Sequence, residues 1–309
     1  MNLDKSSIES IVREVVERRL GADAGSQPGN GEPVCDLPNA GAFKDKLSRD
    51  EPAFGVWLTL EAPSITEMAC RMGFDWIVID AEHGYLDMKN VMEHIRVANL
   101  SNTTILVRIA EIQEGLIKRI MDIGADGIVV PQVRTAEQVA TAVRYAKYPP
   151  EGLRGIGAER ATRWGQGIEQ CVPRANQNSL VVPMMETVDA GESIDQILDV
   201  PGVDAMFFSG VKTREQLEFL SARLRIPIFL GNTPEELADF DFLSTNKVRI
   251  ALQGHLPFMA GVKSVYDTLK LLKDGTTPAE LSDAYSPDLV KMFTRTEDYQ
   301  HWMDKYLSK

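Results

Sequence analysis

The sequence predicts an α/β protein built on a (β/α)8 TIM barrel, with an N-terminal amphipathic helix on a flexible linker and extra C-terminal helices. Eight short apolar runs alternate with amphipathic stretches from residue 54 onward, which is the pattern of βαβ units in a parallel sheet. The chain has 309 residues, enough for one barrel of about 250 residues with additions at both ends. An open doubly wound sheet is the alternative, but no GxGxxG motif follows the first apolar run.

Residues 1–20 are predicted to form a short amphipathic helix. Their apolar side chains recur at helical spacing from Ile8 to Leu20, and Glu and Arg occupy the other face. Residues 21–35 follow as a flexible linker, because their Gly and Pro content opposes regular structure. The helix resembles the encapsulation peptides of bacterial microcompartments, which dock on a shell protein. A helix that packs on its own domain or pairs between subunits is the alternative.

The eight apolar runs are the predicted strands of the barrel. They begin at Phe54, Asp75, Thr104, Gly127, Leu180, Asp204, Ile226 and Lys247. Helical stretches such as ITEMACRMG and LIKRIMDIG lie between them and end in Gly, as a helix stop requires. We therefore place the catalytic barrel at residues 36–275. Residues 276–309 are predicted to form extra helices, which are candidates for exchange between subunits.

Composition and charge narrow the classes of partner. The chain carries 45 acidic and 33 basic residues, and its net charge of −12 opposes binding to nucleic acid or anionic membranes. No apolar run approaches the roughly 20 residues that cross a bilayer. The cysteines Cys35, Cys70 and Cys171 are odd in number and widely spaced, which fits neither a disulfide framework nor a zinc motif. We expect a cytoplasmic protein, free or inside a microcompartment, that acts on a small molecule.

Polar residues follow most of the predicted strands, where barrels of this class carry their chemistry. These residues are Asp80, Glu82 and His83 after the second strand, Arg108 after the third, Gln132 after the fourth, Glu186 after the fifth, Lys212 after the sixth and His255 after the eighth. Because the C-terminal ends of parallel strands meet at one rim, we expect these side chains to surround one small substrate. Trp57, in the first strand, is expected to contact the substrate as well.

The residue types suggest a chemical role for several of these side chains, and for His83 and Arg108 a purely structural role is the alternative. The spacing Asp80-x-x-His83 lets the carboxylate hold the imidazole in one tautomer and raise its basicity, as a general base requires. A His83 that only bonds a loop is equally compatible with the spacing. The planar fork of Arg108 suits a substrate carboxylate or enolate oxygen, or a salt bridge to a neighbouring acidic residue. Glu186 offers hard oxygen atoms to a divalent ion.

Residues 148–160, YPPEGLRGIGAER, combine a rigid Pro-Pro turn with three glycines and two arginines. A long loop of this composition indicates an ordered functional segment, and we expect it to border the active site. A surface connection without a functional role is the alternative.

The same residues resemble the HpcH/HpaI aldolase family of class II pyruvate aldolases. The resemblance rests on GFDWIVIDAEHGY, ILVRI, LIKRIMDIGADGIVVPQV, RYAKYPPEGLRGIG and the MMET that precedes GVDAMFFSG. It implies a divalent metal (Mg, Mn or Co) that chelates a 2-oxo acid and stabilises the enolate. It also implies a homo-oligomer. By the same resemblance, His83 and Asp80 form the acid/base dyad, and Arg108 binds the oxo-acid end of the substrate. The resemblance also implies that Glu186 is a metal ligand and that Glu82 lies near the metal-bound water.

One position departs from the family pattern. The family has a Gly-Pro-x-Asp segment after the sixth strand, and its Asp is the second metal carboxylate; this chain has Lys212 there. Lys212 can replace the metal as a cation, form a Schiff base as an amine with a lowered pKa, or turn away from a metal bound through other ligands. We count Lys212 and Gln132 among the substrate-binding residues.

Beyond Lys212 the sequence resembles the isocitrate lyase and phosphoenolpyruvate mutase superfamily, notably in TREQLEFLSARLRIPIFLGN. Both resemblances imply chemistry through a pyruvate enolate. We therefore expect a carbon–carbon lyase that cleaves a 2-oxo acid to pyruvate and an aldehyde, or runs the addition in reverse. The alternatives are an oxaloacetate-type decarboxylase, a lyase of the isocitrate lyase or mutase type, and a catalytically degenerate barrel that serves assembly.

Overall fold

The computed structural model describes residues 40–49, 51–252, 256–281, 286, 288, 290, 291 and 294–306. The predicted helix of residues 1–20, the linker of residues 21–35 and His255 lie outside the described residues. Among the described residues, no helix combines the length and the apolar character that a membrane crossing requires.

Eight parallel strands form one sheet in which each strand pairs with the next along the chain. The strands are β1 (Gly55–Leu58), β2 (Trp76–Asp80), β3 (Thr104–Arg108), β4 (Gly127–Val130), β5 (Leu180–Met185), β6 (Met206–Phe208), β7 (Ile228–Leu230) and β8 (Val248–Ala251). The backbone N–H of Ala53, just before β1, donates to the carbonyl of Arg249 in β8 at 2.8 Å, so the first and last strands meet. The predicted barrel and all eight of its strands are confirmed.

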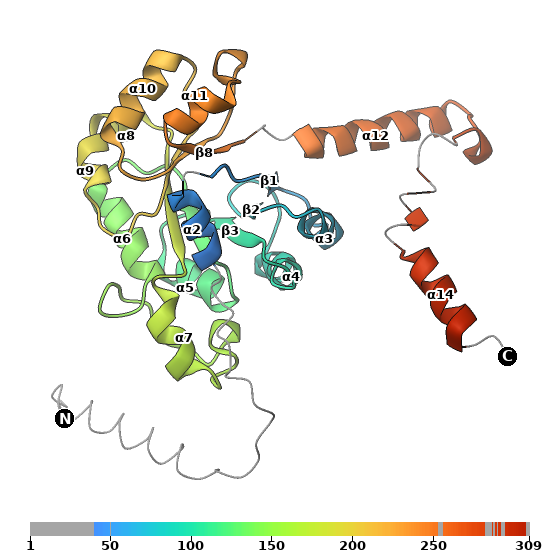
Figure 1. Ribbon diagram of the computed structural model, residues 1–309, viewed down its shortest axis with the longest axis horizontal. Helices are drawn as coiled ribbons and strands as arrows, with labels where there is room; N and C mark the ends of the chain where they lie inside the picture. Colours follow the sequence, from blue (N-terminus) through green and yellow to red (C-terminus); the bar gives the residue numbers. More distant parts are fainter. Residues whose placement is uncertain are drawn as a thin grey trace, which may run out of the picture. The chain divides into compact units, whose positions relative to one another are not determined.

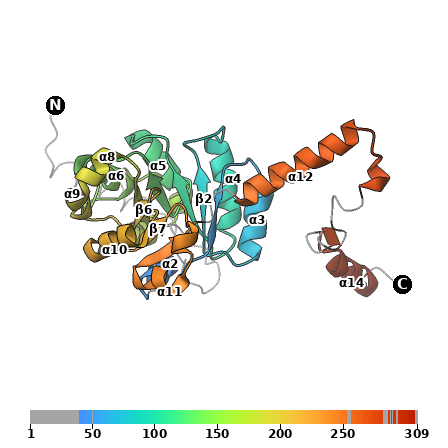
Figure 2. The ribbon, with the colours of Figure 1, turned by 90° about the horizontal axis from the view of Figure 1, so that it is seen from above.

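Helices alternate with the strands and cover the outside of the barrel, as Figures 1 and 2 show for α3 and α4 beside β2. The α-helices with described ends are α2 (Gly41–Ser48), α3 (Pro63–Arg71), α4 (Met88–Ala98), α5 (Glu114–Asp122), α6 (Ala136–Ala146), α7 (Ile168–Ala175), α8 (Val188–Glu192), α9 (Ile194–Leu198), α10 (Arg214–Arg223), α11 (Phe240–Thr245), α12 (Leu256–Lys273) and α14 (Thr296–Tyr306). Three short 3-10 helices are η1 (Arg160–Thr162), η2 (Glu235–Leu237) and η3 (Pro278–Glu280).

The side chains of each strand alternate between two packed regions. Val78, Leu106 and Phe207 belong to the cluster that fills the barrel interior, whereas Ile77 and Ile79 belong to the larger cluster between the strands and the helices. This alternation is the ordinary two-residue period of a strand. The same alternation holds at the C-terminal ends of the strands. The last inward-facing residues therefore point toward the open mouth of the barrel.

The cysteines differ from the expectation of unpaired thiols. Cys70 is a free cysteine, but Cys171 is disulfide-bonded. The expectation that the cysteines form no disulfide was therefore wrong for Cys171.

Candidate active site

Asp80 and Arg108 form the centre of a polar cluster at the mouth of the barrel. They are the last residues of β2 and β3 and are direct partners in the register of the two parallel strands. Arg108 Nε donates to Asp80 Oδ1 at 2.9 Å, and Arg108 Nη2 donates to Asp80 Oδ2. Both residues are buried, at 1% and 8% exposure. The two parallel hydrogen bonds fix the plane of the guanidinium.

Glu82 is a second carboxylate partner of Arg108. Its Oε2 lies 2.9 Å from Arg108 Nη1, and its side chain is 7% exposed. That oxygen has an ion-pair partner but receives no hydrogen bond from the described residues. A buried carboxylate oxygen without a hydrogen bond is unfavourable, so this atom has an unfilled capacity to accept a donor or to contact a cation. The salt-bridge alternative for Arg108 is thus what the structure shows.

Gln132 connects the ends of three strands. It follows β4 with a φ of 51°, in the left-handed region that a non-glycine residue rarely adopts. Its backbone N–H donates to Glu186 Oε1 at 2.7 Å, and its Nε2 donates to Glu82 Oε1 at 2.9 Å. One residue therefore orients a carboxylate that follows β2 and another that follows β5.

Trp57 supports this cluster from inside the barrel. Its indole Nε1 donates to Asp80 Oδ2 at 3.0 Å, and the guanidinium of Arg108 lies 4.9 Å from its ring centroid. Trp57 is buried and packs edge-to-face on Phe207. Burial alone would raise the pKa of Asp80, but the hydrogen bonds from Arg108, Trp57 and the His83 backbone outweigh it and lower that pKa.

His83 lies at the rim, and its contacts differ from the prediction. Its backbone N–H, rather than its imidazole, donates to Asp80 Oδ1, at 3.1 Å. The imidazole Nε2 lies 3.9 Å from Glu82 Oε2, and the side chain is 73% exposed. The predicted Asp80–imidazole contact is therefore wrong for this structure, because Arg108, Trp57 and backbone amides already occupy the two carboxylate oxygens of Asp80.

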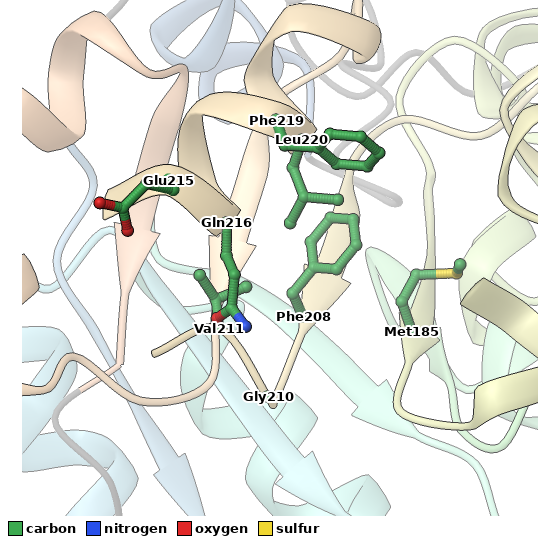
Figure 3. Close-up of a pocket in the computed structure, with 8 residues that line it drawn as sticks. All are labelled: Met185, Phe208, Gly210, Val211, Glu215, Gln216, Phe219 and Leu220. Carbon is green, nitrogen blue, oxygen red and sulfur yellow. The ribbon is translucent and has the colours of Figure 1, made fainter. Parts of the chain in front are cut away.

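Lys212 precedes α10 and is exposed. Its backbone N–H donates to Gln216 Oε1 at 2.8 Å, next to the N-cap Thr213. Among the described residues, its ammonium group has no hydrogen bond or ion pair. A neighbouring cavity of about 400 Å³ is lined mainly by apolar side chains, with Met185 facing Phe208 and Leu220 across it (Figure 3). None of the charged residues of the mouth lines this cavity, so it is separate from the polar cluster.

The loop of residues 148–160 lies at the opposite end of the barrel. Arg154 Nη2 donates to Asp122 Oδ1 at 2.7 Å, and Arg160 Nη1 donates to Asn99 Oδ1 at 2.5 Å. Asp122 and Asn99 stand at the C-terminal ends of α5 and α4. A helix that follows a strand returns the chain to the N-terminal ends of the strands. The loop is ordered, but its predicted place beside the active site was wrong.

The mouth offers carboxylate oxygens to a divalent ion, but few of them. Among the described residues, no group of three or more His, Cys, Asp or Glu side chains is placed to hold a metal. Glu186 uses one oxygen to accept the Gln132 amide, and Glu82 Oε2 has no hydrogen bond. Carboxylate oxygens of this kind are the ligands that a hard divalent ion prefers, so the two side chains are chemically compatible with such an ion.

The profile of one protein family matches residues 53–217, the part of the chain that contains all of these residues. The chain belongs to the HpcH/HpaI aldolase/citrate lyase family. It is 36% identical over 167 residues to the 4-hydroxy-2-oxovalerate aldolase of Novosphingobium aromaticivorans, covering 54% of this chain and 63% of that protein. It is 35% identical over 167 residues to the 2-keto-3-deoxy-L-rhamnonate aldolase of Escherichia coli, covering 53% and 62%. The HpcH/HpaI match thus spans less than two thirds of these relatives.

Solved structures agree with the fold over a longer part of the chain. The HpcH/HpaI aldolase of Desulfitobacterium hafniense superposes with a TM-score of 0.62 at 26% identity, covering 76% of this chain and 98% of that one. A putative phosphonomutase of Burkholderia cenocepacia superposes with a TM-score of 0.53 at 13% identity, covering 78% and 99%. The second similarity concerns the fold alone.

Proposed function

We propose that this HpcH/HpaI family member is a lyase that cleaves a 4-hydroxy-2-oxo acid to pyruvate and an aldehyde, or catalyses the reverse addition. The observation that carries the proposal is the meeting of Arg108 with Asp80, Glu82, Gln132 and Glu186 at the C-terminal strand ends. Two relatives named as aldolases of 2-oxo acids support the same reaction class. The sequence-based alternatives of decarboxylation and of a degenerate barrel become outcomes of the test.

The proposed reaction assigns one task to each side chain. His83, exposed at the rim, takes the proton of the C4 hydroxyl, the C3–C4 bond breaks, and the aldehyde leaves. The electron pair of that bond forms the enolate of pyruvate, which takes a proton at C3. Arg108 and Gln132 bind the oxo-acid end of the substrate, and Asp80 holds Arg108 and the His83 backbone in place. Trp57 acts through Asp80 rather than on the substrate, as its buried indole supports.

We include a divalent ion, Mg, Mn or Co, in the proposed site. Glu186 would bind it directly and Glu82 through a water molecule, and the bound ion would stabilise the negative charge of the enolate. Lys212 then turns away from the ion, the third of its possible roles. The support for this choice is that its ammonium has no hydrogen bond or ion pair within the described part of the chain, whereas its backbone N–H donates to Gln216 in α10.

The test is pyruvate release from 4-hydroxy-2-oxo acids of increasing length and from oxaloacetate, with wild type, His83→Ala and His301→Ala. His301 is exposed on α14 and serves as the matched control. We expect His83→Ala to lower kcat by about 10²- to 10⁴-fold and His301→Ala to leave it unchanged. Equal inactivity of all three proteins on every substrate would support the degenerate barrel. Release from oxaloacetate alone would support the decarboxylase.

Two further measurements separate the roles of Lys212. Loss of activity on chelation, restored by Mg, Mn or Co, supports the metal. Borohydride trapping of a pyruvate adduct on Lys212 supports a Schiff base and contradicts the metal assignment.

We also propose a homo-oligomer with exchange of C-terminal helices between subunits. The support is that α12 and α14 expose large apolar side chains, including Leu269, Trp302 and Tyr306. A groove of about 660 Å³ between the β1 and β8 region and α11 is lined by Val56, Leu243 and other apolar residues. Light scattering that gives the mass of a monomer would contradict this proposal.

Docking of residues 1–20 on a microcompartment shell stays a proposal. Fusion of these residues to a fluorescent protein, followed by co-sedimentation with purified shells, tests it.

A further inference from the structure

A further cavity lies at the end of the barrel opposite the mouth. It has a volume of about 370 Å³ and is bordered by α2 and by the segments that lead into β6, β7 and β8. Its lining residues are Lys44, Leu47, Ser48, Asp204, Arg225, Ile226, Pro227, Lys247 and Arg249. Four of these nine residues are cationic and one is acidic, although the whole chain has a net charge of −12. We call it the basic cavity.

The single carboxylate of the basic cavity is already paired. Asp204 Oδ1 lies 2.5 Å from Lys44 Nζ, and its Oδ2 lies 3.9 Å from the buried ammonium of Lys147. Asp204 Oδ2 also accepts the backbone N–H of Val181 at 2.9 Å. Two ammonium groups thus compensate one carboxylate, so Asp204 does not offset the charges of Arg225 and Lys247.

Lys247 is held in place by neutral partners. Its Nζ donates to the carbonyls of Ser221 and Leu224, at 2.5 and 2.7 Å, near the C-terminal end of α10. Its backbone adopts a φ of 61°, which costs a residue with a side chain more than it costs glycine. Carbonyl groups orient an ammonium but leave its formal charge uncompensated, so Lys247 contributes a fixed positive charge to the cavity.

Helix capping is the plainest explanation for these cations, and it covers only some of them. It accounts for Lys247 and for Arg249, whose Nη1 donates to the carbonyl of Ser244 near the end of α11 at 2.9 Å. It does not account for Arg225, which lines the cavity, is exposed, and makes no hydrogen bond or ion pair within the described part of the chain. Arg225 therefore has its full set of guanidinium donors available beside fixed positive charge.

We propose that the basic cavity binds a compact, multiply charged oxyanion, of which a phosphate group is the simplest example. Arg225 supplies the planar donors that suit such an anion, and Lys44 and Lys247 supply positive charge beside it. Ser48 adds a hydroxyl at the same wall. This site is distinct from the active site, because its lining residues lie at the N-terminal ends of β6, β7 and β8, whereas Asp80, Arg108 and Glu186 lie at the C-terminal ends of β2, β3 and β5. A bound anion would join α2 to the segments before β7 and β8.

Isothermal titration of the full chain with inorganic phosphate, at an ionic strength held constant with chloride, tests the proposal. We expect saturable binding of one phosphate per chain, weakened at least tenfold in Arg225→Ala. The matched control is Arg223→Ala, which removes an exposed arginine two positions away that does not line the cavity. It should bind phosphate as wild type does.

Thermal unfolding provides a second readout, because a ligand of the folded state raises the melting temperature. Phosphate should raise the melting temperature of wild type and Arg223→Ala but not that of Arg225→Ala, and all three proteins should unfold at the same temperature in chloride. The absence of saturable phosphate binding by wild type, or equal binding by the two variants, would overturn the proposal.

Discussion

The two ends of the barrel both bury charge, but with opposite excess. At the mouth, the carboxylates Asp80 and Glu82 share the single cation Arg108, and Glu186 accepts a backbone amide. At the basic cavity, near the other end, Lys44 and Lys147 share Asp204, the one carboxylate in the cavity lining. Each of these two clusters therefore leaves uncompensated charge, negative at the mouth and positive at the basic cavity. The difference indicates that the mouth suits a cation and its chelated substrate, whereas the base suits an anion.

Breaking the ion pairs at the mouth should have the largest effect. Arg108→Met leaves Asp80 and Glu82 buried without their cation, so we expect the free energy of unfolding to fall by about 3–5 kcal/mol and the proposed activity to vanish. Urea unfolding measures the change. The double variant Arg108→Met with Asp80→Asn should regain part of the loss, and a change below about 1 kcal/mol would contradict the structural role of the pair.

Breaking contacts at the base should destabilise the protein without altering the chemistry. Lys147 is buried and donates to the carbonyls of Asn176 and Ser179 at 2.6 and 3.2 Å. Lys147→Met leaves those acceptors without this donor, so we expect a loss of about 1–3 kcal/mol. The kcat per folded molecule should equal that of wild type. A large fall in kcat with an intact fold would show that the two ends are coupled.

The bridging residue of the mouth should affect activity more than stability. Gln132→Gly keeps the backbone donor to Glu186, relieves the left-handed conformation and removes the amide that binds Glu82. We expect kcat to fall by about 10- to 100-fold, as happens when the groups that orient ligands are lost, with little change in the melting temperature. Unchanged kinetics would contradict the positioning of Glu82 by Gln132.

Local sequence patterns predict at which end of the barrel a residue lies. The position of Asp80, Arg108 and Glu186 at the C-terminal ends of their strands was enough to predict that they share one rim, because these ends of parallel strands meet. The order of helix and strand also fixed the position of residues 148–160, yet their glycines and arginines suggested a functional loop. Chain order was the more reliable signal, since it decides to which end of the barrel a connection returns.

The partners of individual atoms could not be predicted. The sequence gives no indication that Arg108 and Trp57 occupy the Asp80 carboxylate and leave the His83 imidazole near Glu82. Likewise, Lys44 and Asp204 are far apart in the chain and meet only when the barrel closes. Such contacts depend on tertiary packing, which composition and spacing do not encode.

The smallest predicted effect is a pH dependence at His94, a buried histidine of α4. Burial lowers the pKa of His94, whose Nδ1 lies 2.6 Å from Thr66 Oγ1. The unfolded chain takes up a proton below about pH 6.5, whereas folded His94 stays neutral to a lower pH. Stability should therefore fall as the pH drops below about 6.5, and the slope should be shallower in His94→Gln. Equal slopes in urea titrations of the two proteins would contradict this assignment.

The pairing of Asp80 with Arg108 across adjacent strands also bears on how the barrel assembles. A shift of one residue between β2 and β3 would reverse the direction of one side chain relative to the other and leave a charge against the apolar layer under the helices. The ion pair therefore disfavours a shifted register of β2 and β3 during folding, independently of any substrate. The residues proposed for chemistry thus also help to select the correct strand alignment during folding.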